Sequence, residues 1–152
     1  TIEEIDGQIH RAQFDDEGTV HLVIDSRDFD GGDGDLSMVL DTGKNVAGWL
    51  KGREDERWRG DLAIAMRAGF TDQYGNPSRQ YVLDMRFDGD ELRKVNYQDA
   101  NFFQWRWANF ATEVKPRQQA GRGIVTDYCN DETVIRYSLQ FCSTYALGQA
   151  NR

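Results

Sequence analysis

The sequence predicts a mainly β fold, with an α+β arrangement as the alternative: an antiparallel barrel or sandwich with one or two short helices. Polar and apolar residues alternate along several segments, and clusters of turn-forming residues separate these segments. Helical spacing is confined to two stretches. The chain has 152 residues, 39% of them hydrophobic, and no repeat or low-complexity linker, which predicts a single domain over 1–152.

The first expected element is a β-hairpin near the N-terminus. Apolar residues alternate with polar ones over 20–24, and the acidic, glycine-containing segment 15–18 marks the turn before them. If that segment closes a short loop, Ala12 lies opposite His21. This register makes His10 and His21, the two histidines of the chain, diagonal neighbours on the polar face of the hairpin.

A second hairpin is expected further along the chain. Apolar residues alternate over 62–70 and again over 81–87, and the Gly-Asn-Pro sequence at 75–77 provides the turn. The Asp-Gly-Asp sequence at 88–90 is expected to turn the chain into a third strand through 95–97. Three sequential strands with short turns predict an antiparallel meander.

Two more strands are expected in the C-terminal half. Over 101–114, alternation places Phe103, Trp105 and Trp107 on one face of a strand. Apolar and polar residues also alternate over 133–142, which predicts a strand covered on its apolar face. Together with the earlier elements, these segments predict a sheet of roughly seven to nine strands.

Two stretches carry helical spacing. A short helix is expected over 117–129, because apolar residues recur there at helical intervals after a proline. A second is expected over 45–57, although Gly48 inside it weakens helix formation. Both helices are expected to pack against the sheet.

The charge of the chain limits the partners that it can attract. The formal net charge is −8, from 26 acidic and 18 basic residues. Because this charge repels phosphate, we expect neither nucleic acid nor an anionic membrane surface as the partner. A basic protein partner would be attracted, although net negative charge also serves solubility alone. The oligomeric state is left open.

Two cysteines, Cys129 and Cys142, lie near the C-terminus. Their even number and short separation predict either one disulfide, formed in an oxidising compartment, or two buried thiols. Neither cysteine lies in a C-x-x-C pair or near a histidine, so the spacing does not favour a zinc or redox site. An extracytoplasmic location is slightly favoured, and Thr1 at the start fits either a removed leader or an excised Met.

An Asp/Gly-rich segment is the candidate metal site. Asp28, Asp30, Asp33 and Asp35 crowd four carboxylates into eight residues that include three glycines. Calcium is the cation that such oxygen ligands on a flexible loop would hold. The spacing departs from the EF-hand pattern, because Gly32 stands where that pattern has its third Asp or Asn. The alternative is a solvated loop without metal or any other cofactor.

Two weaker motifs bear on catalysis. His10 or His21 could act as a base or, with a carboxylate, hold a transition metal, but no carboxylate follows at a convincing cross-strand position. The Asp-Thr-Gly sequence at 41–43 matches an aspartic protease half-site, which would have to dimerise. Lys44 stands where that site has a small residue, so a strand ending in a turn is the better interpretation.

The aromatic stripe is the candidate ligand-binding surface. On a strand face, Phe103, Trp105 and Trp107 could stack on sugars or bases, or they could fill the core. Because no catalytic motif appears, we expect a non-catalytic protein-interaction module that binds a macromolecular partner through an acidic and aromatic surface. Inhibitors, immunity-type proteins and phage or secretion accessory proteins have this profile. The first alternative is a small-ligand or carbohydrate-binding β-barrel stabilised by calcium. The second is an enzyme that uses His10 or His21.

Overall fold

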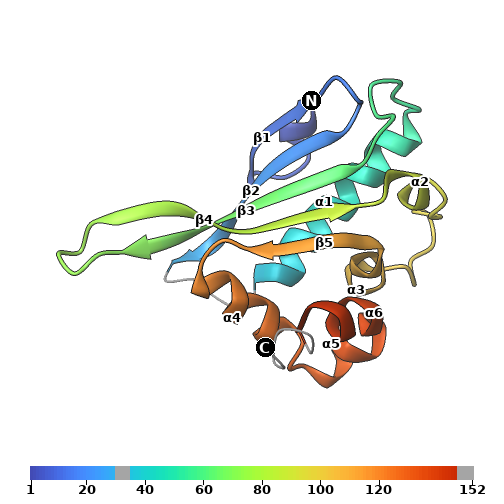
Figure 1. Cartoon of the computed structure of the whole chain (residues 1–152). Helices are drawn as coiled ribbons and strands as arrows, with labels where there is room; N and C mark the ends of the chain where they lie inside the picture. The colour runs from blue at the N-terminus through green and yellow to red at the C-terminus, as the bar shows by residue number, and fades with distance from the viewer. Residues whose placement is uncertain (30–34, 147–152) are drawn as a thin grey trace.

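The computed structural model of the chain describes residues 1–29 and 35–146, with side chains described for 1–26 and 36–146. It is an α+β fold, 40% helical and 29% strand, around a mixed five-stranded sheet that does not close into a barrel (Figure 1). The expected mainly β barrel or sandwich is therefore wrong. Helices, not further strands, account for most of the chain outside the two hairpins.

The sheet has the spatial order β1-β2-β3-β4-β5, the same order as in the sequence. Its strands are β1 (Ile9–Phe14), β2 (Val20–Phe29), β3 (Leu62–Thr71), β4 (Pro77–Phe87) and β5 (Ala111–Pro116). β2 and β3 run parallel, and the other neighbouring pairs run antiparallel. A parallel pair needs a crossover connection, and a long helix between β2 and β3 provides it.

That crossover is α1, and shorter helical segments follow the hairpins. The helical segments are η1 (Ile2–Glu4), α1 (Asp35–Gly52), α2 (Gly89–Leu92), α3 (Gln104–Trp107), η2 (Ala108–Phe110), α4 (Gln119–Tyr128), α5 (Glu132–Tyr137), α6 (Leu139–Phe141) and η3 (Cys142–Ala146). Helices α1, α3 and α4 lie on one face of the sheet (Figure 1). The apolar core fills the space between this face and the helices.

Both expected hairpins are present, but the register of the first is shifted by one residue. In β3 and β4, Ile64 pairs with Met85, as the alternation in this hairpin predicts. In β1 and β2, Gln13 and not Ala12 lies opposite His21. Asp15 and not Phe14 lies opposite Thr19, because the backbone N–H of Asp15 bonds the carbonyl of Thr19 at 3.0 Å, and the loop is reduced to residues 16–18.

The expected strand over 133–142 is wrong. Asp131 caps α5, because its side chain accepts hydrogen bonds from the backbone N–H groups of the first helical turn. Val134, Ser138 and Phe141 are buried at intervals of four and three residues, which is the spacing of a helix face. The apolar alternation that predicted a strand therefore runs across both faces of this helical segment, and Leu139 is 61% exposed.

The expected strands through 95–97 and 101–110 are also wrong. Asp88 accepts a hydrogen bond from the backbone N–H of Asp90 at 2.9 Å and caps α2, so the chain enters a helical turn instead of a β-turn. The ring of Tyr97 folds back, and its hydroxyl donates to the carbonyl of Leu92 at 2.9 Å. Only β5, from Ala111 onward, keeps part of the expected strand.

The helix expected over 117–129 is confirmed as α4, and the helix expected over 45–57 is the second half of the longer α1. The Asp-Thr-Gly sequence at 41–43 lies inside α1, so the strand-and-turn interpretation of this motif is wrong. Gly43 allows a close approach of the helix to the core. A Cβ there would lie 2.9 Å from Trp107 and 2.8 Å from Ile64.

Two glycines of α4 give a matched test of how this helix packs. A Cβ on Gly121 would lie far inside van der Waals contact with the carbonyl oxygen of Val82 on β4, whereas a Cβ on Gly123 meets nothing within 4 Å. We expect Gly121→Ala to lower the free energy of unfolding by about 1–3 kcal/mol, because α4 must move off the sheet. Gly123→Ala should raise it by about 0.5–1 kcal/mol, because alanine favours the helix. Urea unfolding of both variants checks this, and stabilisation by both would show that α4 does not approach β4 so closely.

Candidate functional site

The face of the sheet opposite α1 carries no helix in the part of the chain that the structure describes (Figure 1). We call it the open face. Strand register aligns its side chains in two rows across all five strands and a third, shorter row. The rows are Arg11-Val23-Ala65-Asp84-Lys115, Gln13-His21-Ala63-Arg86-Glu113 and Asp25-Arg67-Tyr81. The alternation that predicted half-buried strands accounts for this polar face.

Small residues occupy the centre of the open face. Ala63 and Ala65 lie on the middle strand, β3, and the residues on either side of them carry longer side chains. The result is a hollow of ≈ 580 Å³, which we call the trough. Arg11 lines it from β1, and Arg117, which follows β5, lines it from the other side. A convex group of a partner can therefore approach the sheet backbone closely between charged edges.

Ion pairs cross the open face and hold its charged side chains in place. Arg67 forms two hydrogen bonds to Asp25, at 2.7 and 2.9 Å, in the bidentate geometry that fixes both groups. Arg117 donates to Asp84 at 2.6 Å, and its guanidinium lies 4.9 Å from the centre of the Tyr81 ring. The Arg117 rim of the trough is therefore preorganised, and Arg67 is held in place beside the trough.

The face is nearly balanced in charge, unlike the chain as a whole. It carries six cations against five carboxylates, counting the carboxylates that pair with it from neighbouring loops: Arg11, Arg67, Arg79, Arg86, Lys115 and Arg117 against Asp15, Asp25, Asp61, Asp84 and Glu113. The whole chain has a net charge of −8. The acidic character expected of a binding surface therefore lies elsewhere on the molecule.

His21 has a carboxylate partner that the sequence analysis missed. Its Nε2 lies 2.8 Å from Oδ2 of Asp15, in the turn between β1 and β2. This hydrogen bond is the main cause that lowers the pKa of Asp15. The sequence signal that could have revealed this pair is an aspartate at the start of a turn, because the strand that follows the turn runs back past its side chain. His10 lies at an irregularity of the β1–β2 pairing, so the expected histidine pair does not follow from the actual register. A catalytic role for either histidine stays a prediction.

Asp61 anchors one end of the open face to α2. One of its oxygens accepts the backbone N–H of Gly89 at 2.9 Å, and the other accepts Nε of Arg86 at 2.9 Å. Burial by itself raises the pKa of this carboxyl, but these two donors more than offset it, so the pKa lies below its ordinary value. The charged form of Asp61 is therefore the one that the fold stabilises.

A pH prediction follows from this lowered pKa. A carboxyl with a lowered pKa in the folded state contributes stability above its unfolded pKa and loses it as the pH falls through its folded pKa. We expect Asp61→Asn, which keeps an acceptor for Gly89, to destabilise the protein at pH 7. The difference from the parent should shrink as the pH falls below about 4. Urea unfolding across this range measures it, and a difference that stays constant with pH would contradict the charge-based explanation.

The β3–β4 hairpin extends past the rest of the sheet as an arm (Figure 1). β5 pairs with β4 only from Leu83 onward, and residues 71–80, which we call the arm, are all exposed. The side chain of Asp72 accepts the backbone N–H groups of Tyr74 and Asn76, at 2.8 and 2.9 Å. Gly75 has φ of +83°, which glycine adopts without strain. The turn thus holds Tyr74, 79% exposed, at the tip.

The expected aromatic stripe is not on a strand: Phe103 is the N-cap of α3, and Trp105 and Trp107 lie within that helix. Trp107 is fully buried and stacks on Phe87 with ring centres 4.3 Å apart. Phe103 and Trp105 are partly buried and pack with Tyr137 of α5, at 4.9 and 6.2 Å between ring centres. A helix therefore separates the three rings into a core residue and a pair at the junction of α3 and α5. As a ligand-binding set they stay a prediction.

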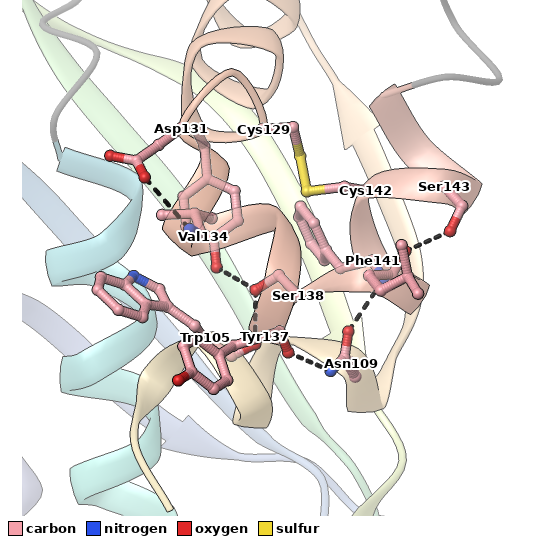
Figure 2. The surroundings of a disulfide bond; sticks show 12 residues. Trp105, Asn109, Cys129, Asp131, Val134, Tyr137, Ser138, Phe141, Cys142 and Ser143 are labelled. Carbon is pink, nitrogen blue, oxygen red and sulfur yellow. Dashed lines mark hydrogen bonds between the residues drawn. A yellow bond between two sulfur atoms is a disulfide. The ribbon is translucent and has the colours of Figure 1, made fainter.

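The disulfide between Cys129 and Cys142 is present and joins the end of α4 to the start of η3 (Figure 2). Next to it, Ser138 donates a hydrogen bond to the carbonyl of Trp105 at 2.5 Å. Because Ser138 has a single hydroxyl hydrogen, Tyr128 must be the donor in the buried 2.6 Å bond between their oxygens. The disulfide and these hydrogen bonds tie the C-terminal helices to α3.

A second hollow, of ≈ 400 Å³, lies beside this disulfide. It is mainly apolar, and the exposed side chains of Ile135 and Leu139 line it together with both cysteines. It lacks the opposed charged rims of the trough. The trough and the arm are therefore the stronger candidate site.

The expected calcium loop is not tested by the structure. Asp30 and Asp33 lie outside the described residues, and the side chains of Asp28 and Asp35, at the ends of β2 and α1, are not described either. Elsewhere in the described chain, no three His, Cys, Asp or Glu side chains lie together as metal ligands would. None of the helices described is long and apolar enough to span a membrane.

Comparison with known proteins adds no relative. The chain matches no family model, no curated protein and no solved structure. Its function must therefore be inferred from its own residues.

Proposed function

We propose that the chain is a non-catalytic protein-interaction module that binds a partner protein on its open face and arm. The observation that carries this proposal is the open face, with the trough at its centre and the ion pairs that fix Arg67 and Arg117. Side chains that are already fixed lose little conformational entropy when a partner binds. The arm enlarges this surface and adds an exposed aromatic anchor, Tyr74.

The charge distribution supports a protein as the partner over nucleic acid. The open face has almost no net charge, and the remainder of the chain is strongly acidic. A nucleic acid carries phosphates along its whole length, so beyond the open face its backbone would meet the acidic surroundings, which a short segment confined to the trough does not. The expected basic partner stays a prediction, because a basic surface would be attracted to the acidic remainder and not to the trough itself.

Site-specific crosslinking in the native cell tests this proposal. We would place the photo-crosslinking residue p-benzoylphenylalanine at Gln13 on the open face, at Tyr74 on the arm, and at Asp127 on α4 as an exposed control. We expect the first two positions to give the same discrete crosslinked partner, and the control to give none. Equal crosslinking from Asp127 would contradict a selective surface on the sheet.

Binding to the purified partner then separates a true interface from proximity. Ala65→Leu fills the floor of the trough and is expected to weaken binding by about tenfold or more. Thr126→Leu makes a similar side-chain enlargement on the exposed surface of α4 and should leave Kd unchanged. An unchanged Kd for Ala65→Leu would exclude the trough as the contact surface.

A further inference from the structure

We infer that the trough recognises an acidic segment of the partner protein, so that carboxylates of the partner lie between Arg11 and Arg117. This inference rests on the proposed function and adds the chemistry of the bound segment.

The carboxylates around the trough are already engaged. Asp84 accepts from Arg117 at 2.6 Å, and Asp15 lies 2.8 Å from the imidazole of His21. Asp61 uses both of its oxygens, on the backbone N–H of Gly89 and on Arg86. A lysine or arginine of a partner would therefore share these carboxylates with donors that already occupy them. This arrangement disfavours a basic segment in the trough.

Donors are in surplus at the same place. A guanidinium has five N–H donors, and the pair with Asp84 uses only Nε of Arg117. Arg11 is exposed and has no ion-pair partner among the residues that the structure describes. The two guanidinium groups lie on opposite sides of the trough. The carboxylates of a segment that crosses the trough would therefore meet charge-assisted donors at each rim, Arg11 at one and Arg117 at the other.

The floor of the trough suits a peptide segment. Val23, Ala63 and Ala65 present little side-chain volume, so a partner backbone can lie close to the sheet while its acidic side chains reach the rims. A second copy of this chain is a poor occupant. Its own open face would bring the same surplus of donors against these donors, and like charges would oppose each other.

The probe for this inference is a short acetylated peptide of alternating alanine and glutamate, followed by NMR titration of the full chain labelled with ¹⁵N. We expect the amide signals of β1, β2 and β3 around the trough to shift. Arg11→Gln and Arg117→Gln should each weaken binding by about tenfold, the effect of losing one charge-assisted hydrogen bond. Arg122→Gln, on the exposed surface of α4, changes the net charge equally and should weaken binding by less than about twofold.

Each outcome decides between the inference and its alternatives. If the Arg122 variant weakens binding as much as the Arg11 variant, the attraction is unspecific and the inference is overturned. Binding of a matched alanine–lysine peptide, or of single-stranded DNA in place of the acidic peptide, would overturn it as well. If the acidic peptide shifts no signal of the open face while crosslinks from Gln13 still form, the acidic segment is wrong but the proposed function stands.

Discussion

Replacing Trp107 by alanine is expected to lower the free energy of unfolding by about 3–5 kcal/mol, the largest effect of any single substitution considered for this chain. The indole is completely buried between the sheet and α1. It stacks on Phe87 and donates to the hydroxyl of Tyr97 at 3.3 Å. Its removal leaves a large cavity against Gly43, which has no side chain to fill it.

Urea unfolding followed by circular dichroism measures this effect. Trp105→Ala is the matched control, since this ring is only partly buried and donates a hydrogen bond to Ser37 at 3.1 Å. It should cost clearly less than Trp107→Ala, because part of its area is already in water. A Trp107→Ala variant as stable as the Trp105→Ala variant would show that the aromatic stripe does not divide between core and periphery as described.

Removing the disulfide is expected to lower the free energy of unfolding by about 3 kcal/mol. Cys129 and Cys142 are 13 residues apart, so their bond restricts the unfolded chain over a loop of that length. The double variant Cys129→Ala/Cys142→Ala tests this by urea unfolding. Local opening should increase most in the C-terminal helices and α3, because these are the elements that the disulfide region connects.

Two controls separate the disulfide from side-chain packing. Adding a reductant to the parent protein should reproduce most of the loss, whereas the reductant should not affect the double variant. Hydrogen exchange should accelerate more for the amides of α5 and α6 than for those of β3 and β4. Equal stability of the oxidised and reduced parent would contradict a stabilising role for this bond.

The sequence carried reliable information wherever alternation continued through two segments joined by a strong turn. The hairpin formed by 62–71 and 77–87 follows directly from alternation, because one face of these strands is apolar and buried and the other face is more polar and more exposed. Alternation misled over 133–142, where a buried Ser138 belongs to the core face and an exposed Leu139 does not. A serine is expected to be exposed and a leucine to be buried, and both expectations are wrong here. The burial of these two residues is set by tertiary contacts, which the sequence pattern does not show.

The candidate site was predictable only in part. A polar strand face follows from alternation, but the side chains that meet across it depend on register. The pairing of Asp15 with Thr19 shifts the register by one residue and moves Gln13 to the position expected for Ala12. The rims of the trough join β1 to the end of β5, residues such as Arg11 and Arg117 that are far apart in the sequence. Their position around one hollow depends on the α1 crossover, which places β2 beside β3.

The parallel contact of β2 with β3 also sets the order in which the chain can fold. The β1–β2 and β3–β4 hairpins close from neighbouring residues, but Asp25 reaches Arg67 across 42 positions of sequence. Closing so long a loop is slow, so this seam should join last. Until it does, two strands expose bare hydrogen-bonding edges that can pair with other chains. Refolding yield should therefore fall as protein concentration rises.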